Sequence, residues 1–161
     1  MDAFGTTAAR LDYPVYIVTT AVQGLAAGCL VGFAMQASIR PARFLIGISN
    51  ANETAGVAAR ASHLAVHVVD RRNMELARLF GEISGDDVDK FDRCFWHPGP
   101  NGLPILDTAA AWFGGRILDR IFMGDHTGYL ITTERGEVFH ADAPLLTLAD
   151  VRDFHPGHEV R

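Results

Sequence analysis

The chain has 161 residues, of which 48% are hydrophobic and 20% charged, and 19 acidic against 14 basic residues give a formal charge of −5. This length predicts one domain with its own core, and the acidic balance argues against a nucleic-acid or anionic-membrane partner. The two cysteines, Cys29 and Cys94, have no CxxC spacing and cannot form a disulfide framework, which favours a reducing, cytoplasmic setting. The first residues carry an early acid and no apolar core, so no secretory signal is expected.

An uncharged stretch covers residues 13–39, which is long enough for a membrane span. Several polar residues interrupt it, and its first half is β-branched and aromatic, which favours strands instead. We therefore expect a strand over residues 13–21, a turn at Gln23–Gly24, and a second strand over residues 28–38 that bends at Gly32.

The other elements follow from apolar runs and capping residues. Strands are expected over residues 43–49, 64–69, 110–122, 128–133 and 145–148, with a loop over residues 96–104 and a hairpin turn at Arg135–Gly136. Short helices are expected from an Asn50 or Asn52 cap to about residue 61, from Asn73 over residues 74–80 with Gly81 ending the helix, and over residues 86–91. Strands and helices do not alternate regularly, so a β-barrel or sandwich with helical additions is favoured over a doubly wound sheet.

The histidine pattern gives little support for a metal site. His63 and His67 fall on one face of a predicted strand, but no third ligand stands nearby, so ordinary structural or surface histidines are favoured. No phosphate-binding or nucleophile-elbow motif occurs in the chain. Cys94 stands among aromatic residues and is expected to be an inert buried thiol.

Residues 28–54 form the first candidate binding segment. Gly28 permits close approach of a flat ligand, and Gln36 and Ser38 place two donors on one strand face. Asn52 and Thr54 open a helix, and such an N-terminus can hold a phosphate. Ordinary N-capping is the alternative interpretation.

The second candidate is Gly124-Asp125-His126, where a histidine beside an acid enters a strand. Such a histidine can contact an anionic or redox ligand. A turn aspartate with a structural histidine is the alternative.

Both segments, in this order, resemble the flavin reductase-like family. The resemblance covers about residues 13–148 and is carried by the sequences VYIVTT, GCLVGFAMQASIRPARFLIGIS, NET, LAVHVV, ELARLFG, DKF, GLPIL and GDHTGYL. It implies a mainly β fold, a six-stranded Greek-key FMN-binding split β-barrel with a few short helices, found typically as a homodimer. The whole chain, 1–161, is then one domain with its core at about 13–148 and a polar tail over 149–161.

The family's first signature, G-x-T-x-x-S-F-x-S-x-S-x-x-P-P, corresponds to the stretch that begins at Gly28. Gly28, Ser38 and Pro41 keep the pattern; Leu30, Phe33, Ala34, Gln36 and Ala42 depart from it. Several hydroxyls that would reach the flavin or its phosphate are therefore absent, although main-chain N–H groups of residues 29–31 could serve the ring.

The resemblance assigns roles to individual residues. The flavin would contact Gly28, Cys29, Leu30, Val31, Gln36, Ala37, Ser38, Ser49, Asn52, Thr54, Lys90 and Phe91. Of these, Ser49, Asn52 and Thr54 match a phosphate-binding stretch, and Lys90-Phe91 matches a Lys-Phe motif. Asp125 and His126 would form the catalytic pair near the flavin and the nicotinamide.

The function implied is an FMN-dependent NAD(P)H:flavin oxidoreductase, with FAD as an alternative cofactor and a separate monooxygenase as the implied partner. Three alternatives stay open: a non-enzymatic flavin-binding or electron-carrier protein, a relative that uses deazaflavin, and a β-barrel interaction module without a ligand. Neither NADH nor NADPH is favoured by the sequence.

Overall fold

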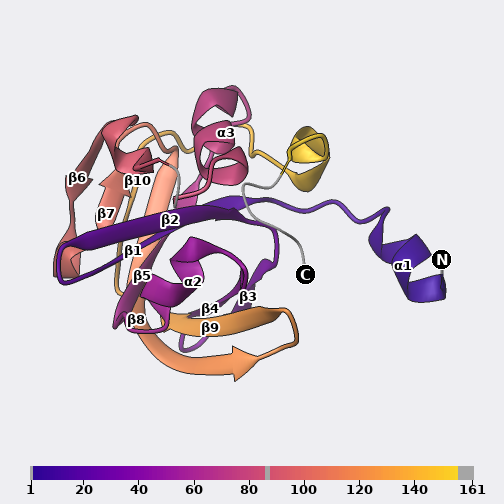
Figure 1. Ribbon diagram of the computed structural model, residues 1–161, viewed down its shortest axis with the longest axis horizontal. Helices are drawn as coiled ribbons and strands as arrows, with labels where there is room; N and C mark the ends of the chain where they lie inside the picture. The colour runs from indigo at the N-terminus through magenta and orange to yellow at the C-terminus, as the bar shows by residue number, and fades with distance from the viewer. Residues whose placement is uncertain (1, 86–87, 156–161) are drawn as a thin grey trace.

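The structure is a computed structural model that describes residues 2–85 and 88–155, shown in Figure 1. The described strands are β1 (Tyr16–Val22), β2 (Leu25–Val31), β3 (Ala34–Ser38), β4 (Arg43–Ser49), β5 (His63–Val68), β6 (Trp96–Pro98), β7 (Pro104–Leu106), β8 (Ala111–Phe122), β9 (His126–Thr132) and β10 (Arg135–Val138). The α-helices are α1 (Ala3–Ala8), α2 (Glu53–Ala58) and α3 (Met74–Glu82), and single 3-10 turns are η1 (Lys90–Asp92), η2 (Pro100–Gly102) and η3 (Leu148–Val151).

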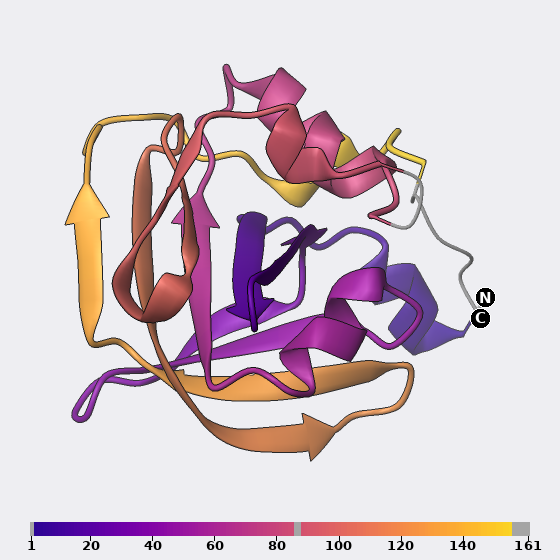
Figure 2. The same ribbon diagram turned by 60° about the vertical axis from the view of Figure 1, so that its left-hand side comes forward.

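Eight strands form one antiparallel sheet that curls on itself, in the order β2-β1-β5-β8-β9-β4-β3 with β10 paired to β8 (Figure 2). β6 and β7 form a separate two-stranded sheet. β8 is 12 residues long and belongs to both halves of the sheet. Its first part pairs with β5 and β10, and its second part pairs with β9. The expected split β-barrel with a few short helices is confirmed.

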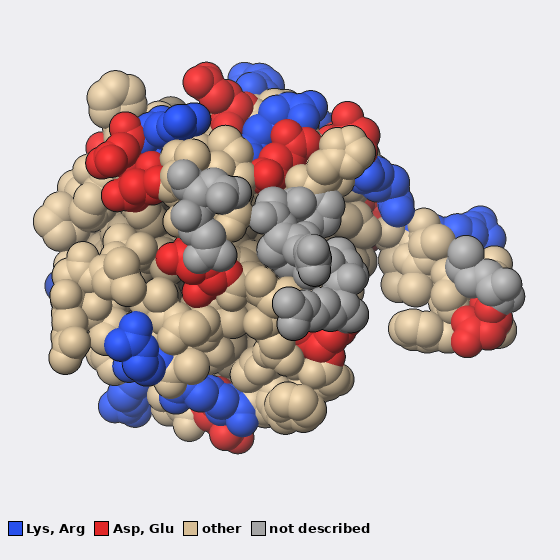
Figure 3. All heavy atoms as spheres, viewed as in Figure 1, with Lys and Arg blue, Asp and Glu red and all other residues tan. Residues whose placement is uncertain are grey.

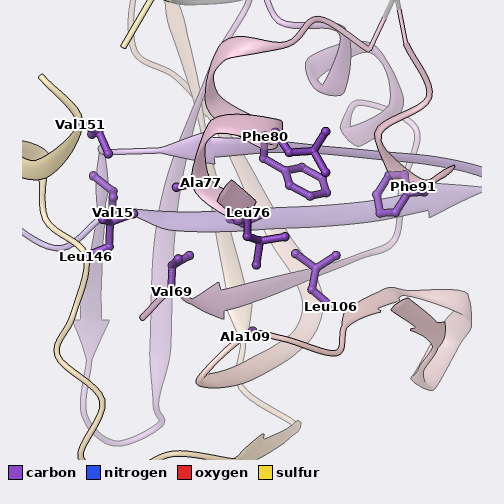
Figure 4. Packing of buried hydrophobic residues seen from close by; sticks show 12 residues of the cluster. Val15, Val69, Leu76, Ala77, Phe80, Phe91, Leu106, Ala109, Leu146 and Val151 are labelled. Carbon is purple, nitrogen blue, oxygen red and sulfur yellow. The ribbon is translucent and has the colours of Figure 1, made fainter. Parts of the chain in front are cut away.

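The curled sheet wraps around an apolar interior. Residues of β1, β2, β4, β5 and β9 meet there, among them the fully buried Val18, Ile46, Leu64 and Ile131. A second cluster lies outside the barrel, where α3 packs its Leu76 and Phe80 against the sheet (Figure 4). The uncharged stretch over residues 13–39 is therefore strand, and no helix of the described residues is long and apolar enough to cross a membrane.

His67 ties three strands together between these two clusters. Its Nδ1 lies 3.0 Å from the carbonyl oxygen of Ile17, and its Nε2 accepts a hydrogen bond from the main-chain N–H of Leu106 at 3.1 Å. The side chain is fully buried, so both ring nitrogens are satisfied inside the protein. The histidine of this strand is thus structural, as the sequence favours.

Local sequence signals place most element ends correctly. Gln23 and Gly24 have φ values of +51° and +80° and form the β1–β2 turn, and β4 has the predicted bounds. Asn52 and Asn73 cap α2 and α3 by accepting the N–H groups of Thr54 and Leu76.

Five expectations are wrong. The second strand is two strands, β2 and β3, separated at Gly32, and α3 passes through Gly81 to end at Glu82. The expected loop over residues 96–104 contains a β-hairpin, in which Trp96 pairs with Leu106. Residues 145–148 make only isolated bridges before η3, because Pro14 and Asp70 offer single partners rather than a ladder.

The fifth error concerns Arg135–Gly136, which lies inside β10 and pairs with β8 instead of forming a turn. The helix expected over residues 86–91 falls partly outside the described residues, and its described end is the 3-10 turn η1.

The N-terminal helix α1 projects from the barrel on an arm, seen as a separate lobe in Figure 3. None of its residues is buried, and Phe4 is exposed. The base of the arm is held by Arg152, whose guanidinium donates to the carbonyl oxygens of Ala9 and Leu11 at 3.1 and 2.8 Å.

Candidate functional site

Loops from three parts of the chain meet at one end of the barrel: the β2–β3 corner, the β4–α2 loop and the β8–β9 hairpin. The pairing of β4 with β9 places Ser49 opposite His126, so the loops that follow these strands become neighbours. The side chain of Asn50 joins them, because it donates to the carbonyl oxygen of Gly124 at 3.2 Å and accepts from the Thr127 hydroxyl at 2.7 Å.

The Gly124-Asp125-His126 motif forms the tip of this cluster. Gly124 has a φ of +129°, a backbone conformation that residues other than glycine rarely adopt. The Asp125 carboxylate lies 2.7 Å from Nδ1 of His126, and the two side chains are 68% and 25% exposed. Because Asp125 engages Nδ1, and Nε2 has no hydrogen bond to any described residue, Nε2 is the nitrogen that can meet a ligand.

The candidate phosphate residues share the turn at the start of α2. Asn52 uses its side-chain oxygen to cap the Thr54 N–H at 3.0 Å, and the Ser49 hydroxyl accepts the Ala51 N–H at 3.3 Å. The Thr54 hydroxyl is fully buried and has no hydrogen bond to an oxygen or nitrogen of the described residues, and the Cys29 thiol is the polar group beside it. If the Thr54 side chain rotated outward, a ligand oxygen could accept a hydrogen bond from this enclosed hydroxyl.

The side chains of residues 28–31 do not form a ligand-facing surface. Cys29 and Val31 are buried in the barrel core, where burial raises the pKa of the Cys29 thiol to about 11. A Cβ on Gly28 would lie 2.9 Å from the ring of Phe80, so this glycine serves the packing of α3. The expectation that these side chains contact a ring is wrong for Cys29 and Val31, and only the main chain here stays a candidate.

Lys90 and Phe91 lie in the packing between β2 and α3. The Lys90 ammonium is 5% exposed and donates to the carbonyl oxygens of Gly28 and Phe80 at 3.1 and 3.4 Å. Burial lowers the pKa of Lys90, whereas Cys29 and Glu53 act in the opposite direction. The Phe91 ring packs between the rings of Phe80 and Trp96, so Phe91 has a structural role. Among the described residues, the carbonyl oxygens of Gly28 and Phe80 are the hydrogen-bond partners of the ammonium, which use two of its three donors.

Gln36, Ala37 and Ser38 lie on β3, the edge strand of the sheet. Gln36 and Ala37 are exposed, and the Gln36 amide donates to the carbonyl oxygen of Ser38 at 3.2 Å. These residues can meet a ligand or a neighbouring molecule from the open edge of the sheet.

Two contributors to the site carry a weak signal in the sequence. The sequence indicates Asn50 only as a helix cap, although its side chain holds the loops together. Phe33 stands where the family signature has a serine, and its ring centroid lies 4.8 Å from that of His126. The order of the strands, which the sequence does not state, is what brings these residues to the predicted motif.

Comparison with known proteins agrees with this fold. The family model of the flavin reductase like domain matches residues 8–155, and the chain belongs to this family. A ferric-chelate reductase (NAD(P)H) of Archaeoglobus fulgidus is 25% identical over 154 residues, which cover 94% of this chain and 90% of that protein.

A second relative and a solved structure are also similar to this chain. The reductase component of a flavin-dependent trigonelline monooxygenase from Acinetobacter baylyi is 26% identical over 126 residues, covering 78% of this chain but 38% of that protein. Among solved structures, the NADH:FAD oxidoreductase of Streptomyces globisporus, crystallised with NAD and FAD fragments, superposes with a TM-score of 0.79 at 21% identity, covering 98% of this chain and 90% of that chain.

Proposed function

We propose that the protein is a flavin reductase that uses FMN, or alternatively FAD, and takes its electrons from NADH or NADPH. The observation that carries this proposal is the Asp125–His126 pair, which stands beside the exposed Phe33 ring at the loop end of a flavin reductase barrel. The names of the Archaeoglobus and Streptomyces relatives support the use of a nicotinamide and a flavin.

The residues at the loop end fit a flavin. An exposed aromatic ring and an imidazole suit a planar ring system, and the buried Thr54 hydroxyl suits a phosphate oxygen. The Glu53 carboxylate would repel a phosphate at the same turn. Lys90 is the cation that interacts with Glu53. Ser49, Asn52 and Thr54 would hold the phosphate, and the main chain of residues 28–31 with Gln36 and Ser38 would serve the ring and ribityl chain.

The flavin, when bound, supplies the hydride chemistry with the nicotinamide. The protein's own contribution is positioning and electrostatics. Asp125 fixes the orientation of the His126 ring and accepts from Nδ1, so that Nε2 faces the ligand side. The Asn50 bridge keeps the β8–β9 hairpin against the β4–α2 loop, which holds His126 and Asn52 at a constant separation.

Absorbance of the purified protein and steady-state oxidation of NADH or NADPH with added FMN test this function. Nicotinamide oxidation that requires FMN is the expected result. A bound flavin without nicotinamide oxidation would indicate an electron carrier, and a deazaflavin spectrum would indicate the related cofactor. A colourless protein that fails to quench FMN fluorescence would favour the alternative of a β-barrel interaction module without a ligand.

We also propose a homodimer. Large apolar side chains are exposed on the half of the sheet that ends at β3 and on the last part of β8: Met35, Ile39, Leu118, Ile121 and Phe122. Ile39 and Phe122 are 77% and 82% exposed. A monomer rarely exposes so many large apolar side chains on neighbouring elements. A second copy of the chain would cover this surface.

Light scattering at micromolar protein is expected to give the mass of two chains. Phe122→Glu should raise the dissociation constant about tenfold or more, because a charge would be buried in the interface. Phe95→Glu is the control, since Phe95 is 78% exposed but lies outside this half of the sheet. A monomeric wild-type protein contradicts the dimer.

A monooxygenase that receives the reduced flavin is the proposed protein partner, in line with the name of the Acinetobacter relative. The two unpaired cysteines are compatible with the reducing cytoplasm, which we propose as the location. Co-purification with a flavin-dependent oxygenase from the source cells would support the monooxygenase partner. Recovery of the protein in the cytoplasmic fraction would support the proposed location.

A further inference from the structure

Phe33 is an exposed ring on a rigid support. It stands between β2 and β3 with 56% of its surface exposed, and its carbonyl oxygen accepts the Gly47 N–H at 2.6 Å. Its ring is tilted by 57° against the ring of His126. The backbone hydrogen bond to β4 fixes where this ring stands relative to the histidine.

Two paired glycines make room for this arrangement. Gly47 of β4 lies opposite Gly128 of β9. A Cβ on Gly47 would lie 3.1 Å from the Cβ of Phe33 and 3.2 Å from Cε of Met123, and one on Gly128 would lie 3.0 Å from Sδ of Met123. The glycines thus leave a bare area of sheet on which Phe33 and the Met123 thioether lie.

An exposed phenyl ring beside an imidazole and a polar loop is suited to a planar heteroaromatic ligand. At the corresponding position the family signature has a hydroxyl that would reach the flavin, so this chain offers an aromatic face instead. We propose that Phe33 is the residue on which the isoalloxazine ring of the flavin stacks, and that stacking replaces hydrogen bonding to hydroxyls at this corner. The assignment rests on the proposed function.

Binding of three flavins to the apoprotein tests the assignment, with FMN, riboflavin and lumiflavin titrated by fluorescence quenching. All three share the isoalloxazine ring, but only FMN carries a phosphate. Phe33→Leu is expected to weaken all three by the same factor, roughly three- to tenfold. Phe33→Tyr keeps the ring and should bind as the wild type does. Phe95→Leu, which removes another exposed phenyl ring, should change nothing.

The outcomes separate the assignment from the proposed function. If the wild type binds flavin and Phe33→Leu binds it equally well, the stacking assignment is wrong and the function stands. Loss of FMN binding alone would place Phe33 near the phosphate, and a raised KM for the nicotinamide with unchanged flavin affinity would place it on the other ring; either result overturns the assignment. Phe33→Val, which also removes the ring and adds no hydroxyl, gives the same comparison if Phe33→Leu folds poorly. A wild type that binds no flavin overturns both.

Discussion

Thr54→Val and Thr54→Ala are expected to weaken FMN binding about tenfold to a hundredfold, while riboflavin binding stays the same. The proposed site places the Thr54 hydroxyl on the phosphate, and a charge-assisted hydrogen bond is worth roughly 1.5–3 kcal/mol. Riboflavin has no phosphate and therefore should not respond. Fluorescence titration of both ligands measures the two affinities.

In the unliganded protein, loss of the Thr54 hydroxyl should be favourable, because it should raise the free energy of unfolding. The Thr54 hydroxyl is buried without an oxygen or nitrogen partner among the described residues, and the Cys29 thiol beside it is only a weak hydrogen-bonding group, so burial of this hydroxyl is destabilising. Thr54→Val keeps the shape of the side chain, so it should raise the free energy of unfolding of the apoprotein by about 1 kcal/mol.

Thr20→Val is the matched control for this prediction, since the buried Thr20 hydroxyl donates to the carbonyl oxygen of His63 at 2.9 Å. This variant should lose stability and keep its FMN affinity. If FMN and riboflavin affinities move together in the Thr54 variants, or if neither moves, Thr54 is only a helix-start residue.

Acidification from pH 7 to pH 5 is expected to lower the free energy of unfolding by about 2 kcal/mol through His67 alone. Burial lowers the pKa of His67 from its ordinary 6.5 to about 4, with the bond to the Ile17 carbonyl acting in the opposite direction. The unfolded chain therefore takes up the proton first as the pH falls. The contribution of His67 is fully present above pH 6.5 and is lost progressively as the pH falls towards 4.

Urea unfolding at several pH values between 7.5 and 5 measures this slope. His67→Gln should be less stable at pH 7 but should show a flatter pH dependence, because a glutamine does not titrate. His140→Gln is the control: His140 is exposed, so the steep slope should remain. An unchanged slope in His67→Gln would show that other groups set the acid sensitivity.

Sequence patterns recover the elements whose signals are local. The β4 run RFLIGIS, the Gln23–Gly24 turn and the Asn52 and Asn73 caps all carry their own signal within a few residues. The β6–β7 hairpin does not, because its prolines and glycines are typical of a loop and its strands pair only with each other. Residues 145–148 fail for the reverse reason: their composition suits a strand, but the segments around Pro14 and Asp70, which lie beside them, pair with them only through single bridges.

The candidate site could be predicted only in part for a related reason. The Gly124-Asp125-His126 motif and the capping turn at Asn52 are local and stand out in the sequence. Their contact through Asn50 depends on the register of β4 against β9, which no local pattern gives. The direction of the side chains in β2 was also hidden, since this strand is apolar on both faces and α3 covers one of them.

Lys90 gives the chain a built-in probe of local opening, because it is the only lysine among the 161 residues. Its ammonium is enclosed against β2 and α3, so an amine-reactive reagent can reach it only when the segment that carries η1 moves away. The rate at which Lys90 is modified, followed by mass spectrometry of the labelled peptide, therefore measures how often that movement occurs. A single residue thus makes the mobility of one wall of the fold measurable in the unaltered protein.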